Sequence, residues 1–231
     1  MPQRLKLLAA CLGLLAFAAA TGCNRGQSGS QPPAATIGGS TAASPSAEGP
    51  AGTSPQKPAA DPRHPEVLIE TSLGNITLRL DAEKAPLTVD NFLSYLGAAF
   101  YDQTIVHQVY KGQGILAGGY GTNLVEKSAR TPIRNEALNG LKNHRGAVAM
   151  VRQPDAIDSA TSQFFINVAD NPALDYTDRT PAGYGYCVFG EVIAGMEDVV
   201  DKINNVPVHD AAGLDRTPVQ PIVVKSIRRI R

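Results

Sequence analysis

Between Glu66 and Arg231 the chain consists mainly of short apolar segments separated by turns, and this pattern limits the fold more than any other feature. EVLIET and NITLRL alternate apolar and polar residues on either side of the turn SLGN, as the two strands of a β-hairpin do. Further segments have the length and apolar content of strands: TIVHQV, GILA, GAVAMV, SQFFINV, CVFGEV and PIVVKSIRRI. The sequence therefore predicts about eight strands.

Only two segments have the features of helices. The first begins at Pro86, has Thr88 or Asp90 as its candidate N-cap, and ends at Gly97. The second covers roughly residues 195–204 and carries apolar side chains at helical spacing, which indicates a face packed on a core. This content predicts a mainly β fold, a closed eight-stranded β-barrel with two helices, and argues against alternating strands and helices around a parallel sheet.

The chain begins with features of an export signal. Arg4 and Lys6 precede an apolar run that ends at Ala20, and this run is shorter than the about 20 residues that span a membrane. The next residues complete Ala20-Thr21-Gly22-Cys23, which is similar to the lipobox of bacterial lipoproteins, although Ala20 stands where that motif usually has Leu. We expect residues 1–22 to be a signal peptide and Cys23 to carry a lipid anchor. The alternative is an ordinary signal cut near the same place.

Residues 23–65 are composed mainly of Gly, Ser, Pro, Ala and Thr. Such a segment buries too little apolar surface to offset the entropy lost on ordering, so we expect a disordered linker. A lipid anchor followed by a linker predicts an exported domain, 66–231, held at a membrane of the cell envelope. A passive tail without a spacing role is the alternative.

Charge and cysteine content exclude several classes of function. Lys and Arg together number 21, as do Asp and Glu, so no net charge directs the chain to nucleic acid. Beyond Cys11 and Cys23 only Cys187 remains, in the apolar stretch YCVFGEV, where we expect a buried thiol. One Cys and four scattered His have no metal-ligand spacing. We expect no metal, no cofactor and a monomer.

The stretch TIVHQVYKGQGILAGGY contains GQGILA, which matches the dinucleotide fingerprint G-x-G-x-x-A. That fingerprint needs a helix directly after its glycines, so that the pyrophosphate meets the helix N-terminus. Here GGYGTN follows, and a sequence so rich in glycine does not begin a stable helix. We therefore interpret the match as accidental.

Several segments, in order along 66–231, carry a resemblance to a known family: APLTVDNFLSYLGAAFYDQTIVH, IRNEALNGLKNHRGAVAM, DSATSQFFINVADNPALDY and GYGYCVFGEVIAGMEDVVDKI. This part of the chain resembles a cyclophilin of the short bacterial type, a β-barrel peptidyl-prolyl cis-trans isomerase. The resemblance implies rotation about X-Pro bonds in proline-containing polypeptides. That rotation has a barrier of about 20 kcal/mol and needs no covalent step.

The resemblance implies site residues by position, and several are of the family's type. Gln163 corresponds to the glutamine that positions the catalytic arginine, and Phe165 and Leu174 correspond to walls of the proline pocket. The resemblance also places Val151 at the substrate-binding surface, and Tyr186 where many cyclophilins have His. Ala173 stands where forms that bind cyclosporin tightly have an aromatic residue.

The departures from the family pattern lie within residues 104–120. The family motif F-H-R is here Val106-His107-Gln108, so Gln108 occupies the position of the catalytic arginine while His107 is kept. The Phe, Met and Gln of the family's G-F-M-x-Q-G-G are replaced, in order, by these residues: Gln113, Gly114 and Leu116. These changes predict weaker catalysis and weaker proline binding.

Three cations are candidates to replace that arginine: Arg152, Lys111 and Arg134. We expect each on the solvated surface. The sequence then leaves two hypotheses. The first is an isomerase of reduced or altered activity, with Gln108 and Gln163 as catalytic residues, that assists protein folding in the cell envelope. The second is a cyclophilin-fold module that binds peptides with little catalysis.

Overall fold

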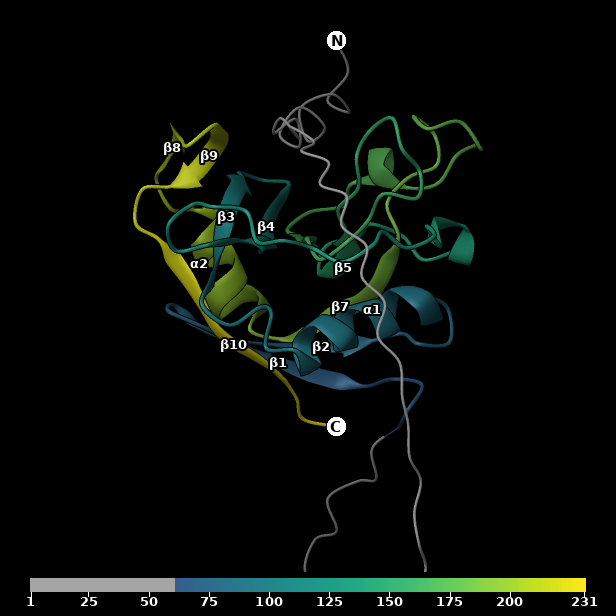
Figure 1. Cartoon of the computed structure of the whole chain (residues 1–231), viewed down its shortest axis with the longest axis horizontal. Coiled ribbons are helices and arrows are strands. Elements are labelled where there is room, and N and C mark those ends of the chain that lie inside the picture. Colours follow the sequence, from purple (N-terminus) through teal and green to yellow (C-terminus); the bar gives the residue numbers. More distant parts are fainter. Residues whose placement is uncertain (1–60) are drawn as a thin grey trace, which may run out of the picture. The chain divides into compact units, whose positions relative to one another are not determined.

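The computed structural model describes residues 61–231, which form a closed β-barrel (Figure 1). Neighbouring strands are antiparallel and follow the order β1-β10-β3-β4-β6-β5-β7-β2 around the barrel. Its strands are β1 (Glu66–Thr71), β2 (Gly74–Leu80), β3 (Thr104–Tyr110), β4 (Gly114–Gly121), β5 (Ala147–Met150), β6 (Phe164–Asn167), β7 (Val188–Ala194) and β10 (Ile222–Arg229). The predicted eight-stranded barrel is confirmed. The predicted signal peptide, Cys23 and the linker up to residue 60 lie outside the described residues.

The strands differ in how many of their faces are covered. In β1 buried and half-buried residues alternate, so one face packs on the barrel interior and the other meets solvent. In β3 all seven residues are buried, and the first six residues of β4 are buried as well. A second layer of residues therefore covers the outer face of this side of the barrel.

Helix α1 (Pro86–Gly97) has the predicted bounds, but its N-terminus is capped in another way. The cap position is Ala85, and no side chain of the helix itself caps it, so the prediction that Thr88 or Asp90 is the N-cap is wrong. The carboxylate of Glu136 instead accepts hydrogen bonds from the backbone N–H groups of Leu87 (3.2 Å) and Thr88 (2.8 Å). A distant carboxylate thus satisfies the free donors of the first turn.

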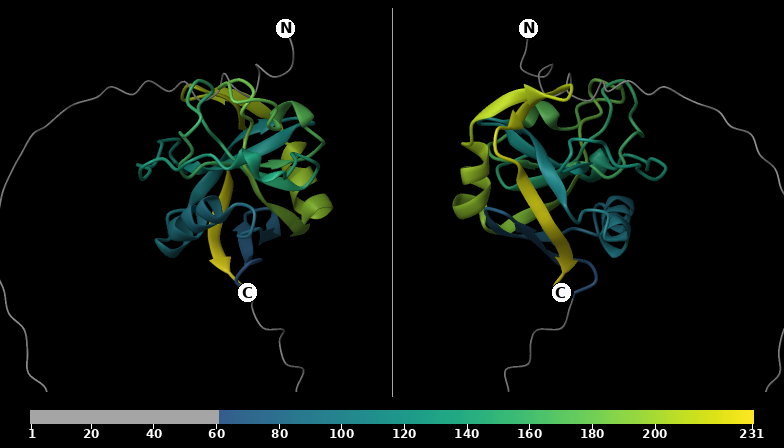
Figure 2. Two further views of the ribbon diagram at one scale, coloured as in Figure 1. Left: turned by 90° about the vertical axis from the view of Figure 1, so that its right-hand side faces the viewer. Right: turned by 60° about the vertical axis from the view of Figure 1, so that its left-hand side comes forward.

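The second helical segment begins with a wide turn, η5 (Met196–Val200), and continues as α2 (Asp201–Asn204). The N–H of Val200 donates to the carbonyl of Gly195, five residues earlier, at 3.0 Å. Gly195 has φ +88°, and a Cβ there would lie 2.3 Å from the carbonyl oxygen of Asn75. Helices α1 and α2 lie on opposite sides of the barrel (Figure 2), and both bury apolar side chains in its core.

A two-stranded hairpin that the sequence did not predict stands between α2 and β10. It consists of β8 (Val208–Ala211) and β9 (Leu214–Pro218), and it lies beside β3 (Figure 1). The strand β8 has three exposed residues of four, so it lacks the apolar alternation that identifies strands from sequence. Two short 3₁₀ turns complete the described elements: η3 (Ala137–Asn139) and η4 (Pro172–Leu174). Within residues 61–231 no helix has the length and apolarity to cross a membrane.

Candidate active site

Strand register separates two rows of side chains across β3, β4, β6 and β5. One row consists of Val109, Ile115, Ile166 and Val148, which belong to the core inside the barrel. The adjacent row consists of Gln108, Leu116, Phe165 and Ala149. Because side chains alternate between the two faces of a sheet, the second row faces outward. Strand pairing thus places Gln108, Leu116 and Phe165, three of the predicted site residues, in one line on the outer face.

Apolar side chains from strands and loops cover this outer face. We call them the outer cluster: Tyr110, Leu116, Ala147, Ala149, Phe165, Leu174, Tyr186 and Val188, with Leu141 and Val151 packed at the edge. The rings of Phe165 and Tyr186 meet edge to face with centroids 5.7 Å apart. The backbone N–H of Tyr186 donates to the carbonyl of Leu174 at 2.9 Å, which joins the two loop residues. The structure thus brings together Leu116, Val151, Phe165, Leu174 and Tyr186.

The outer cluster leaves little of its predicted pocket residues exposed. The exposed fractions are 1% for Phe165, 2% for Leu116, 6% for Leu174 and 7% for Tyr186. Val151 at its edge is half-buried, as is Gln163. Leu141, which also packs at the edge of the cluster, is half-buried as well.

Gln108 faces the hairpin. It is 1% exposed, and its amide nitrogen donates to the carboxylate of Asp215, to the Asp215 carbonyl at 3.3 Å and to the hydroxyl of Tyr110 at 3.4 Å. The Tyr110 hydroxyl in turn donates to the Asp215 carboxylate at 3.3 Å. The amide N–H groups of Gln108 are thus directed at partners within the protein.

Gln163 is anchored beside the outer cluster, next to Val151 at its edge. Its amide nitrogen donates to the Glu126 carboxylate at 3.0 Å, and its backbone carbonyl accepts a hydrogen bond from Val151 at 2.9 Å. Its side chain lies against Gly119, where a Cβ would come within 2.5 Å of the Gln163 Cγ. The glycine therefore makes room for the glutamine.

His107 is buried beneath this region and is neutral. Its ring lies 4.7 Å from that of Tyr120, centroid to centroid, and the residue is 1% exposed. Burial lowers the pKa of His107 to about 3, although the nearby Ile105 backbone and the Gln163 side chain favour its charged form. Within residues 61–231 no donor or acceptor meets both the distance and the angle of a hydrogen bond to either ring nitrogen.

Gln113 and Gly114 form the turn from β3 into β4. The carbonyl of Gln113 accepts hydrogen bonds from the N–H of Val168 (3.0 Å) and from the side-chain amide of Asn171 (2.9 Å). A Cβ on Gly114 would lie 2.9 Å from the carbonyl oxygen of Ile166. Gly114 therefore not only lacks a pocket side chain. The backbone of β6 lies so close to Gly114 that a side chain there would collide with it.

Two arginines flank the outer cluster, and only one of them, Arg152, is among the candidates from the sequence. Arg152 lies over Tyr186, with its guanidinium carbon 5.1 Å from the ring centroid. It is 4% exposed and donates to carbonyl oxygens of four residues: Gly185, Gln153, Pro154 and Pro181. The expectation that Arg152 is a surface residue is wrong, because these carbonyls hold its guanidinium inside the loop. Lys111 and Arg134 are exposed, as predicted.

Arg216, on β9, is the arginine that the sequence analysis missed. Its guanidinium carbon lies 4.9 Å from the centroid of the Tyr110 ring, on the hairpin side of the outer cluster. No motif marks this position, and the hairpin that carries it has no apolar periodicity. The signal that could have found it is the turn sequence DAAGLDR, with glycine inside a polar stretch, ahead of a known strand.

Cys187 is a buried thiol, as predicted. It is 3% exposed, and burial raises its pKa to about 12, so the thiol stays protonated. Its sulfur lies 3.4 Å from the hydroxyl of Thr88.

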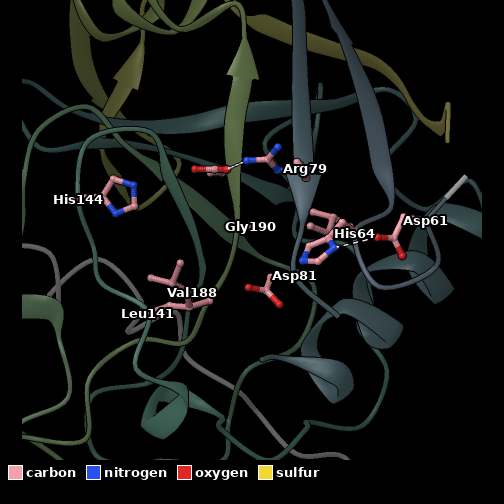
Figure 3. Close-up of a pocket in the computed structure, with 10 residues that line it drawn as sticks. Asp61, His64, Arg79, Asp81, Leu141, His144, Val188 and Gly190 are labelled. Carbon is pink, nitrogen blue, oxygen red and sulfur yellow. Dashed lines mark hydrogen bonds and ion pairs between the residues drawn. The ribbon is translucent and has the colours of Figure 1, made fainter. Parts of the chain in front are cut away.

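A separate pocket of about 420 Å³ opens beside β2 and β7 (Figure 3). Among the described residues that line it, only Leu141 and Val188 also belong to the outer cluster. Its charged groups pair with one another or with neighbours, as in Asp61 with His64 and Arg79 with Glu191. None of the predicted site residues lines it within residues 61–231, so we place the candidate site at the outer cluster.

Comparison with curated proteins finds bacterial relatives that match about 70% of the chain. The chain is 46% identical over 165 residues to "Peptidyl-prolyl cis-trans isomerase A" of Dickeya dadantii, covering 71% of this chain and 84% of that protein. It is 50% identical over 162 residues to a peptidyl-prolyl cis-trans isomerase of Acinetobacter baylyi, covering 70% and 84%. It is 44% identical over 161 residues to "Peptidyl-prolyl cis-trans isomerase B" of Escherichia coli, covering 70% and 97%.

Solved structures and family comparison agree with these relatives. A cyclophilin type peptidyl-prolyl cis-trans isomerase of Cryptosporidium parvum superposes with a TM-score of 0.59 at 25% identity, covering 73% of this chain and 98% of that one. The same protein determined in the presence of the dipeptide Ala-Pro gives a TM-score of 0.59 and covers 72% and 99%. The family model "Cyclophilin type peptidyl-prolyl cis-trans isomerase/CLD" matches residues 66–229. Barrel, strand order and sequence agree, and the chain belongs to the cyclophilin-type peptidyl-prolyl cis-trans isomerase family.

Proposed function

We propose that this domain isomerises X-Pro bonds in exported polypeptides with a lower turnover than cyclophilins that carry an arginine on β3. The observation that carries the proposal is the line of Gln108, Leu116 and Phe165 on the outer face, where an apolar wall stands beside polar amides. An apolar wall suits a proline ring, and amide donors beside it suit the peptide carbonyls.

The chemistry follows from the electronic structure of the X-Pro bond. Rotation removes amide resonance, at a barrier of about 20 kcal/mol, and the imide nitrogen regains its lone pair in the twisted state. A donor directed at that nitrogen stabilises the twisted state more than either planar state, which is the condition for catalysis. No proton moves, so the neutral ring of His107 fits the reaction without acting as an acid or base.

Replacement of arginine by Gln108 accounts for the lower turnover. A hydrogen bond from a charged donor is roughly twice as strong as one from a neutral donor. The loss of about 1.5 to 3 kcal/mol in the twisted state corresponds to roughly a 10- to 150-fold lower rate. The amide nitrogen of Gln108 also faces Asp215 and Tyr110, which makes it a poor donor to a peptide.

Substrate binding should also differ from that of other family members. Leu116 is apolar where the family has glutamine, and it extends the apolar wall beside Phe165. Gln113 and Gly114 supply no large apolar side chain, and each such side chain would contribute on the order of 1.5 to 3 kcal/mol when buried.

Exchange spectroscopy on a short Ala-Pro peptide tests the proposal. The wild-type chain should accelerate exchange between cis and trans peptide, Phe165→Ala should abolish the acceleration, and Gln108→Arg should raise kcat/KM roughly tenfold or more. Phe165→Leu, which keeps an apolar side chain, controls for misfolding, because removing a buried Phe costs about 3 to 5 kcal/mol of stability. If the wild-type chain gives no acceleration at high concentration, the proposal is wrong.

A second candidate function is peptide binding with little catalysis. The observation that favours it is the internal pairing of Gln108 with Asp215 and Tyr110, which leaves the outer cluster without a free amide from β3. In that case a proline peptide would shift amide resonances around Gln163 while its exchange rate stayed uncatalysed. Acceleration of exchange by the wild-type chain would exclude this alternative.

The proposal also covers the location of the domain. The motif Ala20-Thr21-Gly22-Cys23 supports export and attachment to a membrane through a lipid on Cys23, and the polar segment 24–65 would then separate the domain from the membrane. Substrates would be proline-containing polypeptides that fold in the cell envelope.

A further inference from the structure

The hairpin brings a cation to the side of the outer cluster where β3 lacks one. Arg216 lies over the ring of Tyr110 at 4.9 Å, and Tyr110 belongs to the outer cluster together with Leu116 and Phe165. On β3, Tyr110 is two residues from Gln108, on the same face of the strand. Gln108 and Arg216 thus contact the same tyrosine, Gln108 at its hydroxyl and Arg216 over its ring.

An unusual backbone conformation directs Arg216 to this position. Consecutive side chains of a regular strand point to opposite faces, yet Asp215 and Arg216 both contact β3 residues. Arg216 has φ +55°, which few residues other than glycine adopt, and its N–H donates to the Asp210 carboxylate at 3.1 Å. The left-handed conformation breaks the alternation and turns both side chains toward the same face.

The guanidinium groups of Arg216 and Arg152 differ in their exposure and in the number of their hydrogen-bond partners. Arg152 is buried and bound by backbone carbonyls, whereas the side chain of Arg216 is 38% exposed. Besides the Tyr110 ring, its partner among residues 61–231 is the Asp215 carboxylate, at 3.8 Å, which also accepts hydrogen bonds from Gln108 and Tyr110. An exposed ion pair of this length holds a side chain only weakly. Arg216 thus keeps N–H donors that a bound peptide can use.

We propose that Arg216 is the cation that contacts the proline peptide, in place of the arginine missing from β3, and that Gln108 positions it through Asp215. The inference rests on the proposed isomerase function. No bond forms or breaks in the step: the Arg216 N–H groups donate to the X-Pro unit as its nitrogen regains the lone pair, and they are released when the bond becomes planar again. Gln108 is then a positioning residue, because it acts through Asp215 and the hairpin.

The test is a double-mutant cycle at positions 108 and 216, measured on the full chain by exchange spectroscopy with a blocked Ala-Ala-Pro-Ala peptide. Arg216→Gln should lower kcat/KM roughly tenfold or more, and Arg216→Lys should lose less because it keeps the charge. Arg228→Gln is the matched control. Arg228 is an exposed arginine on β10 that pairs with Glu70 on β1, so its replacement should leave the rate unchanged.

Coupling between the two positions gives the sharper readout. If Arg216 serves the same peptide atoms as an arginine at 108, Gln108→Arg will raise kcat/KM by a larger factor in the Arg216→Gln background than in the wild type. The double variant should recover at least the wild-type rate. A merely structural role for Arg216 would not produce this rescue.

The possible results separate the inference from the proposed function. An active wild type with an unaffected Arg216→Gln variant, or equal gains from Gln108→Arg in both backgrounds, overturns the role of Arg216 and leaves the isomerase function intact. An inactive wild type overturns both. Circular dichroism and the urea midpoint of each variant identify misfolding, and the Arg216→Lys variant provides the comparison if Arg216→Gln is unstable.

Discussion

At the scale of single residues, His107 shows how burial fixes a protonation state. The folded domain holds its pKa at about 3, far below the value of about 6.5 expected in an unfolded chain. Between these two values the unfolded state binds a proton that the folded state does not, so unfolding becomes easier as the pH falls. The stabilisation from a neutral His107 is complete above pH 6.5 and is lost progressively toward pH 3.

The loss of this stabilisation at low pH predicts how the free energy of unfolding depends on pH. From pH 7 to pH 5 the free energy of unfolding should fall by about 2 kcal/mol more in the wild type than in His107→Phe, since each pH unit below 6.5 contributes about 1.4 kcal/mol. Urea denaturation at both pH values measures the difference. His144→Gln, at an exposed histidine, should behave like the wild type. Equal pH dependence of wild type and His107→Phe would contradict the prediction.

Resemblance to the family identified part of the outer cluster, namely Leu116, Val151, Phe165, Leu174 and Tyr186, but not how the polar residues beside it are paired. Leu116, Phe165, Leu174 and Tyr186 meet because strand register and a short loop fix them, and family resemblance carries that information. The contact from Gln108 to Asp215 joins residues 107 positions apart through a hairpin with no sequence signal. Such a pair depends on tertiary placement, which periodicity does not report.

At the scale of elements, the β8–β9 hairpin is the part of the domain that sequence patterns predicted least well. Strands β1 to β7 and β10 have apolar alternation or apolar runs, and α1 has proline at its start and glycine at its end, so their bounds were found to within a few residues. The hairpin has mostly polar, exposed residues and is held from outside by β3. The capping of α1 by Glu136 was missed for the same reason, since the capping group is 48 positions away from Thr88.

The hairpin should therefore open locally when its contact with β3 is removed. Asp215 accepts hydrogen bonds from Gln108 and Tyr110, and Asp215→Ala deletes both. Hydrogen bonds to a charged group contribute about 1.5 to 3 kcal/mol, so amide exchange in residues 208–218 should accelerate roughly 10- to 150-fold. Amides of β1 and β10, in the barrel, should keep their protection. Hydrogen-exchange mass spectrometry of the two regions measures this.

A matched control removes an aspartate that does not hold the hairpin. Asp198 is exposed on η5, and Asp198→Ala should leave exchange in the hairpin at the wild-type rate. Equal exchange in Asp215→Ala and Asp198→Ala would mean that the hairpin is held by other contacts. In that case Gln108 would not position Arg216 through Asp215.

At the scale of the whole molecule, the barrel was predictable because several independent features of the sequence indicate the same architecture. Strand number, helix number and the spacing of apolar residues all favoured the same architecture, and a neutral composition excluded a general attraction to nucleic acid. The barrel accounts for residues 66–229, the stretch that the family model matches.

The N-terminal residues carry the last prediction, which concerns where the domain resides. A cysteine after a basic and apolar leader supports lipidation, and one acyl chain alone gives only marginal membrane binding, so stable attachment needs the several chains of a lipoprotein anchor.

Expressed in a bacterial host with its own leader, the full chain should sediment with membranes and enter detergent. Cys23→Ala should move most of it out of the membrane pellet, whereas Cys11→Ala, inside the leader, should leave it there. Because the family model matches residues 66–229 and both substitutions lie outside them, both variants should retain the wild-type kcat/KM on an Ala-Pro peptide. Wild-type chain in the soluble fraction, with Cys23→Ala indistinguishable from it, would show that the leader is an ordinary signal and that the domain acts free of the membrane.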